Sequence, residues 1–391
     1  MKAVSEPLLD EVDLNDVAAG EGHLFVREGV GFAGRGVAAR CTIDEAPELL
    51  RAIDHSDRVG GVAPMAFGTV AFAPGRAGDM IVPEVVVGKG RDGRQWVTRI
   101  GDGLLDVRPA PQPSPDAASF TVEALAPLQQ YLDAVRTARD AVRAGRLAKA
   151  VIAREIRVSS DRPIDVHAVL LRLRASFGSS YRYSLDGFIG ASPELLVCVD
   201  GNVVESHPLA GTAPRTGDPV NDARIAAALV ASTKNQVEHR AVIDMVHDTL
   251  LPWCSYLDWE PEPSIVSVAN VQHLGSRVEG RLSDPRPNVL ELVRALCPTP
   301  ALGGAPRDEA LRLIAEVEGF DRGRYGGAVG WVDADGNGTW AVAIRCAELS
   351  ADRRSARLVA GGGIVADSDP LDELAETQAK FQAMLSALIR P

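Results

Sequence analysis

Residues 325–349 read YGGAVGWVDADGNGTWAVAIRCAEL, and this stretch gives the most direct indication of the fold class. Small, β-branched and aromatic residues flank an Asp-Gly-Asn-Gly sequence at 335–338, which predicts two strands joined by a hairpin turn. Residues 356–365, ARLVAGGGIV, predict a further strand. Residues 370–389, PLDELAETQAKFQAMLSALI, repeat apolar residues at helical spacing and predict a closing amphipathic helix. This mixture favours an α+β fold with strand-rich sheets and peripheral helices.

The rest of the chain continues the same mixture of elements. The N-terminal part contains short apolar runs separated by glycines, which predict strands at 23–26, 68–74 and 80–88. Further along the chain, the pattern predicts strands at 149–158, 195–201 and 202–207, and one or two helices at 220–251.

A proline-rich segment marks a soft boundary in the sequence. Residues 107–118, VRPAPQPSPDAA, contain four prolines and no periodic pattern, which predicts an exposed connection. It separates residues 1–118, which contain few recognisable motifs, from residues 119–391, which contain more. Residues 121–145 then repeat apolar side chains at helical spacing from Leu128 to Val142, which predicts a helix that ends at Gly145.

Composition excludes several classes of function. The formal net charge of −12 disfavours nucleic acid as a partner, because such binding is driven by lysine and arginine neutralising phosphates. No apolar run is long enough to span a membrane, and the first residues lack the pattern of a signal peptide, so we expect a cytoplasmic protein. The five cysteines are scattered without a CxxC pair, which argues against a zinc site and a disulfide framework. An acidic protein can still bind an anion where cations or a metal gather in one cleft.

Two predicted helices carry glutamates in positions where they could bind a metal. Glu373, Glu376 and Lys380 share one helix face, and Lys234 and Glu238 lie one turn apart on another helix. Solvated surface pairs would explain the spacing equally well. Mg²⁺, however, is usually held by one or two protein carboxylates together with an anionic substrate, and Glu238 and Glu376 would suffice. The glycines at 361–363 could either form a tight turn or let the backbone approach a ligand closely.

A series of short motifs runs from Leu147 to Leu388. The motifs are Lys149-Ala-Val-Ile-Ala-Arg154, Gly190-Ala-Ser-Pro-Glu194-Leu-Leu, Pro208-Leu-Ala-Gly-Thr212, Lys234 to His239, His273-Leu-Gly-Ser, Pro298-Thr-Pro-Ala-Leu-Gly-Gly304, Tyr325-Gly-Gly-Ala-Val-Gly-Trp331, Ala343-Ile-Arg345-Cys-Ala347, Gly361-Gly-Gly-Ile-Val365, Ser368-Asp-Pro370 and Glu373 to Lys380. Together they resemble the chorismate-utilising enzymes, the family of isochorismate, salicylate, anthranilate and aminodeoxychorismate synthases. The N-terminal part is looser, but its strands and glycines fit the same family, so the resemblance spans nearly the whole chain.

The resemblance implies a fold and a binding site. The fold would be one large α+β domain over 1–391, with two antiparallel sheets packed face to face, helices outside and a deep active-site cleft. Mg²⁺ would be held by Glu238 and Glu376, with Glu373 bonded through the metal's waters. The substrate, chorismate, would be bound by Arg345, Lys380 and the backbone of Gly361, Gly362 and Gly363, with Thr212, Ala301, Tyr325 and Ile344 nearby. Similar water-using members imply a monomer.

The resemblance also implies a division of catalytic roles. Lys149 would be the base that activates water for attack at C2 of chorismate, and Glu194 would be the acid at the departing C4 hydroxyl. His273 would lie beside that oxygen. Burial near cations would favour a neutral lysine, and partial desolvation would favour a protonated Glu194. Without the resemblance, Lys149 could point to solvent, Glu194 could belong to a turn, and His273 could be a packed core residue.

Isochorismate synthase is the function that these residues indicate best, and two alternatives stay open. Ala210 stands where aminodeoxychorismate synthases carry a lysine, and the absence of that nucleophile argues against attack through a side chain. A salicylate synthase would share the same machinery and then eliminate pyruvate, but residues 298–304 resemble the isochorismate synthase form. A chorismate-binding homologue with weak catalysis is the second alternative, and Cys297 and Thr339 depart from the usual histidine and glutamate. The residues do not choose between menaquinone and siderophore biosynthesis.

Overall fold

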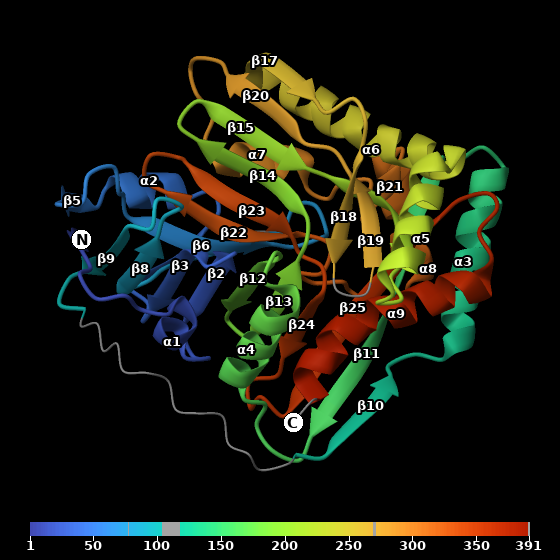
Figure 1. Ribbon diagram of the computed structural model, residues 1–391, viewed down its shortest axis with the longest axis horizontal. Helices are drawn as coiled ribbons and strands as arrows, with labels where there is room; N and C mark the ends of the chain where they lie inside the picture. The colour runs from blue at the N-terminus through green and yellow to red at the C-terminus, as the bar shows by residue number, and fades with distance from the viewer. Residues whose placement is uncertain (77, 104–117, 269–270, 390–391) are drawn as a thin grey trace.

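The computed structural model describes residues 1–76, 78–103, 118–268 and 271–389, and shows two large sheets with helices around them (Figure 1). Thirteen of the described strands form the larger sheet. Their order is β10 (Phe120–Ala124), β11 (Lys149–Ser160), β25 (Ser355–Ile364), β24 (Cys346–Leu349), β13 (Phe188–Ser192), β12 (Tyr181–Leu185), β2 (His23–Arg27), β3 (Val30–Arg35), β8 (Val85–Lys89), β9 (Gln95–Ile100), β1 (Lys2–Pro7) and β5 (Asp54–Asp57), with β21 (Gly304–Ala305) paired to β11.

Two further sheets complete the described strands. The nine-stranded sheet has the order β17 (Cys254–Trp259), β20 (Val278–Leu282), β15 (Val203–His207), β14 (Leu195–Asp200), β23 (Gly338–Val342), β22 (Ala328–Asp333), β6 (Met65–Val70), β7 (Asp79–Val82) and β4 (Ala39–Thr42). A small sheet of three described strands contains β16 (Leu209–Pro214), β19 (Val271–Gly275) and β18 (Ser264–Val268).

The two large sheets pack against each other through a common apolar core. Phe25 and Tyr183 of the larger sheet belong to the same buried cluster as Phe67, Val197 and Trp340 of the nine-stranded sheet. The described helices surround this pair of sheets, and they are α1 (Leu14–Ala18), α2 (Ala46–Arg51), α3 (Leu128–Arg143), α4 (Val166–Phe177), α5 (Pro219–Ala231), α6 (Thr233–Leu250), the single 3₁₀ turn η1 (Leu251–Trp253), α7 (Val289–Leu296), α8 (Arg307–Val317) and α9 (Pro370–Ile389). Within the described ranges, every helix is too short or too polar to cross a bilayer.

The structure confirms the predicted fold class and refines it. Most strand pairs are antiparallel as expected, but β1 and β5 are parallel, and the three-stranded sheet was not predicted. The predicted helix over 121–145 is confirmed only from Leu128, since Phe120–Ala124 pairs with β11 as an edge strand and Pro127 separates the two elements. Of the predicted connection over 107–118, all but Ala118 lies outside the described residues.

Both large sheets combine strands from the N-terminal and C-terminal parts of the chain. In the larger sheet, β2 pairs with β12, and in the nine-stranded sheet β6 pairs with β22. The pairs lie in the middle of the two sheets rather than at their edges. Residues 1–118, which contain few motifs, therefore belong to the same two sheets as the residues that carry the motifs.

Two of the places at which the chain crosses between the large sheets are neighbouring corners. It passes from β13 to β14 through Pro193 and Glu194, and from β23 to β24 through residues 343–345. β13 pairs with β24, and β14 pairs with β23, so the two corners lie side by side. Arg345 adopts a φ of 53°, a left-handed conformation that is uncommon for a residue with a side chain. The predicted hairpin at 325–349 therefore ends early, because Cys346–Leu349 joins the larger sheet instead.

Candidate active site

The predicted site residues converge on one cavity of about 320 Å³. It is lined by Lys149, Glu194 and His273, by Thr212, Ala301, Tyr325, Ile344, Arg345, Gly361, Gly363 and Lys380, and by Glu238, Glu373 and Glu376. Gly362 is the predicted residue that does not line it, although a Cβ atom there would lie 2.5 Å from Glu373 Oε2. Residues from distant parts of the sequence thus meet as the motif pattern predicts, around a space suited to a small molecule.

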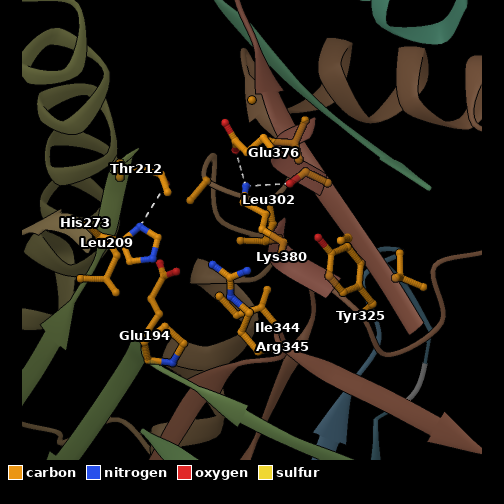
Figure 2. A pocket seen from close by; sticks show the side chains of 18 of the residues that line it. Glu194, Leu209, Thr212, His273, Leu302, Tyr325, Ile344, Arg345, Glu376 and Lys380 are labelled. Carbon is orange, nitrogen blue, oxygen red and sulfur yellow. Dashed lines mark hydrogen bonds and ion pairs between the residues drawn. The ribbon is translucent and has the colours of Figure 1, made fainter. Parts of the chain in front are cut away.

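Glu194 and Arg345 face the same space from the two neighbouring corners (Figure 2). Both side chains are buried, and the Nη1 atom of Arg345 has no hydrogen-bond partner among the described residues. Burial lowers the pKa of Arg345, but a guanidinium stays charged at neutral pH. An unpaired buried donor of this kind costs free energy unless a ligand satisfies it, so Arg345 is well placed to bind an anionic group.

Glu194 is prepared to act as an acid. Burial raises its pKa to about 8, and this effect outweighs the opposing influence of a backbone hydrogen bond from Leu209 and of the Lys149 and Arg345 charges. Glu194 is therefore largely protonated at neutral pH, as the sequence analysis expected. A protonated carboxyl group at a cavity wall can donate a proton to a departing oxygen.

His273 lies on β19 and is held by Thr212 of β16. The His273 Nδ1 and Thr212 Oγ1 atoms are 3.0 Å apart (Figure 2). Burial, with a smaller contribution from the charges of Arg345 and Lys380, lowers the pKa of His273 to about 3. The imidazole is thus neutral, and within the described part of the chain its Nε2 atom has no hydrogen-bond partner. One ring nitrogen is fixed by the protein and the other is available to a ligand.

Lys149 begins β11 and forms an ion pair with Glu238 of α6. Both side chains are mostly buried, with 13% and 19% of their surface exposed. Gly363, on the neighbouring strand β25, allows this arrangement, because a Cβ atom there would lie 2.5 Å from Lys149 Cε. Any larger residue at 363 would push the Lys149 amine away from its present position.

Helix α9 presents a second lysine and glutamate pair to the cavity. Lys380 Nζ lies 2.6 Å from Glu376 Oε1 and donates to the Gly361 carbonyl at 2.8 Å (Figure 2). Burial alone would raise the pKa of Glu376, but Lys380, Arg345 and Lys149 outweigh it and lower the pKa. Glu376 is therefore an anion inside the cavity. One turn earlier on the helix, Glu373 accepts a hydrogen bond of 2.8 Å from Ser368 Oγ.

The acidic side chains fit a magnesium ion that is completed by other ligands. The described residues contain no group of three or more His, Cys, Asp or Glu side chains that could hold a metal alone. Mg²⁺, however, often takes only one or two carboxylates and fills its other positions with water and substrate oxygens. Glu238 and Glu376 line the cavity, and the missing side chain of Gly362 leaves space within 2.5 Å of Glu373 Oε2 and 3.8 Å of Glu376 Oε1.

The cavity also contains residues that the sequence analysis did not select. Leu302 and Val151 supply apolar surface, and Asn235 extends from the first turn of α6. Asn235 and Leu302 belong to motifs that had been recognised, but an amide or an apolar side chain gives no chemical signal of its own. Cys297 and Thr339, the two departures from the family pattern, do not line the cavity. Thr339 instead lies 3.3 Å from the sulfur of Cys198.

Comparisons with known proteins indicate one family. The family model described as "Chorismate binding enzyme" matches residues 53–389. A Mycobacterium tuberculosis protein that is provisionally named isochorismate synthase MenF is 42% identical over 368 residues, which cover 90% of this chain and 92% of that protein. Isochorismate synthase DhbC of Bacillus subtilis is 38% identical over 354 residues, covering 87% of this chain and 84% of that protein.

A solved structure extends the similarity to the fold. The crystal structure of a Bacillus anthracis protein, provisionally assigned as the 2,3-dihydroxybenzoate-specific isochorismate synthase DhbC, superposes with a TM-score of 0.81. The two proteins are 34% identical, and the match covers 96% of this chain and 98% of that one.

Proposed function

The chain belongs to the chorismate-binding enzyme family, and from this premise we propose that it is an isochorismate synthase. It converts chorismate to isochorismate, with water adding at C2 and the C4 hydroxyl leaving. The net change moves a hydroxyl group within one molecule, so we assign the enzyme to the isomerases. All three relatives carry isochorismate synthase names, which favours release of isochorismate over salicylate.

The observation that carries this proposal is the burial of the Glu194 carboxyl group in a cavity that Lys149 also lines. A buried acid with a pKa of about 8 can protonate the leaving C4 oxygen at neutral pH. Lys149 lines the same cavity and can take a proton from the attacking water once it is a free amine. Because Lys149 is paired with Glu238 in this structure, that ion pair must open before the water is activated.

The remaining side chains bind and orient the substrate in this proposal. Arg345 and Lys380 would pair with the carboxylates of chorismate, and the Nη1 atom of Arg345, which has no partner among the described residues, supports its part in this binding. The Nε2 atom of neutral His273, unpaired within the described part of the chain, would contact the C4 oxygen near Glu194. Glu238 and Glu376, with Glu373 nearby, would hold Mg²⁺, which supplies positive charge to a substrate carboxylate when bound.

The pH dependence of the rate follows from Glu194. The acid form exists below the pKa of about 8, so kcat is expected to fall as the pH rises through that value. The measurement is kcat against pH at saturating chorismate. The folded state is followed over the same pH range by circular dichroism. A rate that stays constant to about pH 10 would contradict the role of Glu194 as the acid.

Product analysis tests the proposed function as a whole. The purified protein is incubated with chorismate and Mg²⁺, with and without a chelator, and products are resolved by chromatography while salicylate fluorescence is followed. We expect isochorismate alone, formed only without chelator. Salicylate with pyruvate would identify a salicylate synthase instead, and unchanged chorismate would identify a binding protein.

We further propose that the reaction takes place in the cytoplasm. The support is that all five cysteines are free thiols in the structure, although some are only partly buried. Thiols of this kind persist in a reducing compartment.

A further inference from the structure

A buried ion pair lies behind one wall of the cavity and does not touch the cavity itself. Arg322 and Glu318 have side chains that are each only 1% exposed. Neither residue lines the cavity. The Nε atom of Arg322 donates to Glu318 Oε2 at 2.8 Å, and a second nitrogen, Nη2, donates to Oε1 of the same carboxylate. The planar guanidinium is thus fixed by a two-point contact with the carboxylate.

The same pair bonds to the backbone of two segments that form the wall. Arg322 Nη1 donates to the Leu302 carbonyl at 2.8 Å, and Nη2 donates to the Val151 carbonyl at 2.7 Å. Glu318 in turn accepts a hydrogen bond of 2.7 Å from the Ala153 amide. The guanidinium also stacks 4.2 Å from the centre of the Phe72 ring.

These contacts connect directly to residues of the active site. Val151 lies two residues after Lys149 on β11, and the segment containing Leu302 continues into β21, which pairs with Lys149 and Ala150. The backbone amide of Tyr325 donates to the Arg322 carbonyl at 3.1 Å. Val151, Leu302 and Tyr325 all line the cavity. Arg322 therefore joins the three segments that form this wall: its guanidinium bonds to the Val151 and Leu302 carbonyls and lies 5.9 Å from the centre of the Tyr325 ring, and its backbone carbonyl accepts from the Tyr325 amide.

We propose that Arg322 and Glu318 are positioning residues that set the placement of Lys149, Leu302 and Tyr325 around chorismate. This inference rests on the proposed isochorismate synthase activity. Its physical basis is that small misplacements of a catalytic group raise the reaction barrier, even when the substrate still binds. A residue that only stabilises the fold would lack this effect on the rate of the folded enzyme.

Positioning of the active site can be tested separately from stabilisation of the fold, because a protein can often stay folded without a buried ion pair. Removing one partner leaves a buried unpaired charge, whereas replacing both with apolar residues is often tolerated. The double variant Glu318→Leu with Arg322→Met removes both charges and also the hydrogen bonds to Val151, Leu302 and Ala153. It therefore loosens the wall without leaving a charge in the core.

The experiment measures kcat, KM and melting temperature for the wild type and the double variant. We expect a folded double variant with a kcat lowered about tenfold or more, and a smaller change in KM because Arg345 and Lys380 are untouched. Arg35→Met is the matched control, because Arg35 also donates to two backbone carbonyls, those of Val17 and Asp16, away from the cavity. It should lower the melting temperature without changing kcat.

Each outcome decides between the two roles. A folded double variant with wild-type kcat and KM would overturn the positioning role. If the double variant does not fold, Arg322→Lys takes its place, because lysine keeps the charge beside Glu318 but lacks the planar guanidinium. A lowered kcat in Arg322→Lys then supports the proposal, and an unchanged kcat overturns it. If the wild type and Arg35→Met both fail to make isochorismate, the proposed function itself has failed, and the positioning role falls with it.

Discussion

Lys149→Gln is expected to abolish conversion of chorismate while leaving magnesium-dependent binding of chorismate in place. Glutamine is one methylene shorter and keeps an N–H donor on the Glu238 side of the cavity, but its amide cannot accept a proton from water. Loss of a general base typically lowers the rate by about 10² to 10⁴. Chromatography of the products gives kcat, and calorimetric titration of chorismate in the presence of Mg²⁺ gives the affinity.

The control for this variant is Lys89→Gln. Lys89 also pairs with a glutamate, Glu11, at 2.8 Å, but on the surface and away from the cavity. Its replacement should leave kcat and chorismate binding unchanged. If Lys149→Gln continued to transfer the hydroxyl at a similar rate, Lys149 could not be the base.

Glu376→Ala should weaken Mg²⁺ binding and so lower the activity that depends on Mg²⁺. The substitution deletes a carboxylate that is an anion inside the cavity and leaves Lys380 without its partner at 2.6 Å. Loss of an outer partner of a metal site can weaken metal affinity about 10- to 100-fold, and we expect loss of a direct ligand to cost at least as much. Calorimetric titration with Mg²⁺, with and without chorismate, measures this affinity independently of the reaction rate.

Glu309→Ala is the matched control for the metal variant. Glu309 pairs with Arg312 on α8, so this change also removes one glutamate from a helical ion pair. It should not alter Mg²⁺ affinity, because Glu309 does not line the cavity. Wild-type Mg²⁺ affinity in Glu376→Ala would remove Glu376 from the proposed set of ligands.

The sequence predicted well those features that depend on local spacing. The shared helix face of Glu376 and Lys380 appears in the structure as an ion pair within one turn, and the turn at 335–338 joins β22 and β23. Spacing alone could not distinguish the two helical clusters from two solvated surfaces, whereas in the structure Glu238 from one and Glu376 and Lys380 from the other line the same cavity.

Other features depend on the tertiary fold and left little trace in the sequence. The left-handed conformation of Arg345 exists because the chain changes sheets at that point, and nothing in residues 343–347 specifies such a corner. Arg322 and Glu318 are spaced as an ordinary surface pair on a helix would be, yet both are buried. Their burial follows from packing against Val151 and Leu302, which are distant in sequence.

The way in which the two parts of the chain share both sheets sets a limit on how the protein can be divided. A fragment that begins at Ala118 would keep Lys149, Glu194, Arg345 and helix α9, yet it would lose β2 from beside β12 and β6 from beside β22. Each lost neighbour would uncover a row of unpaired amides and carbonyls, which promotes aggregation. The catalytic motifs therefore do not form a minimal enzyme, and truncation at the proline-rich segment should yield insoluble protein rather than a smaller active one.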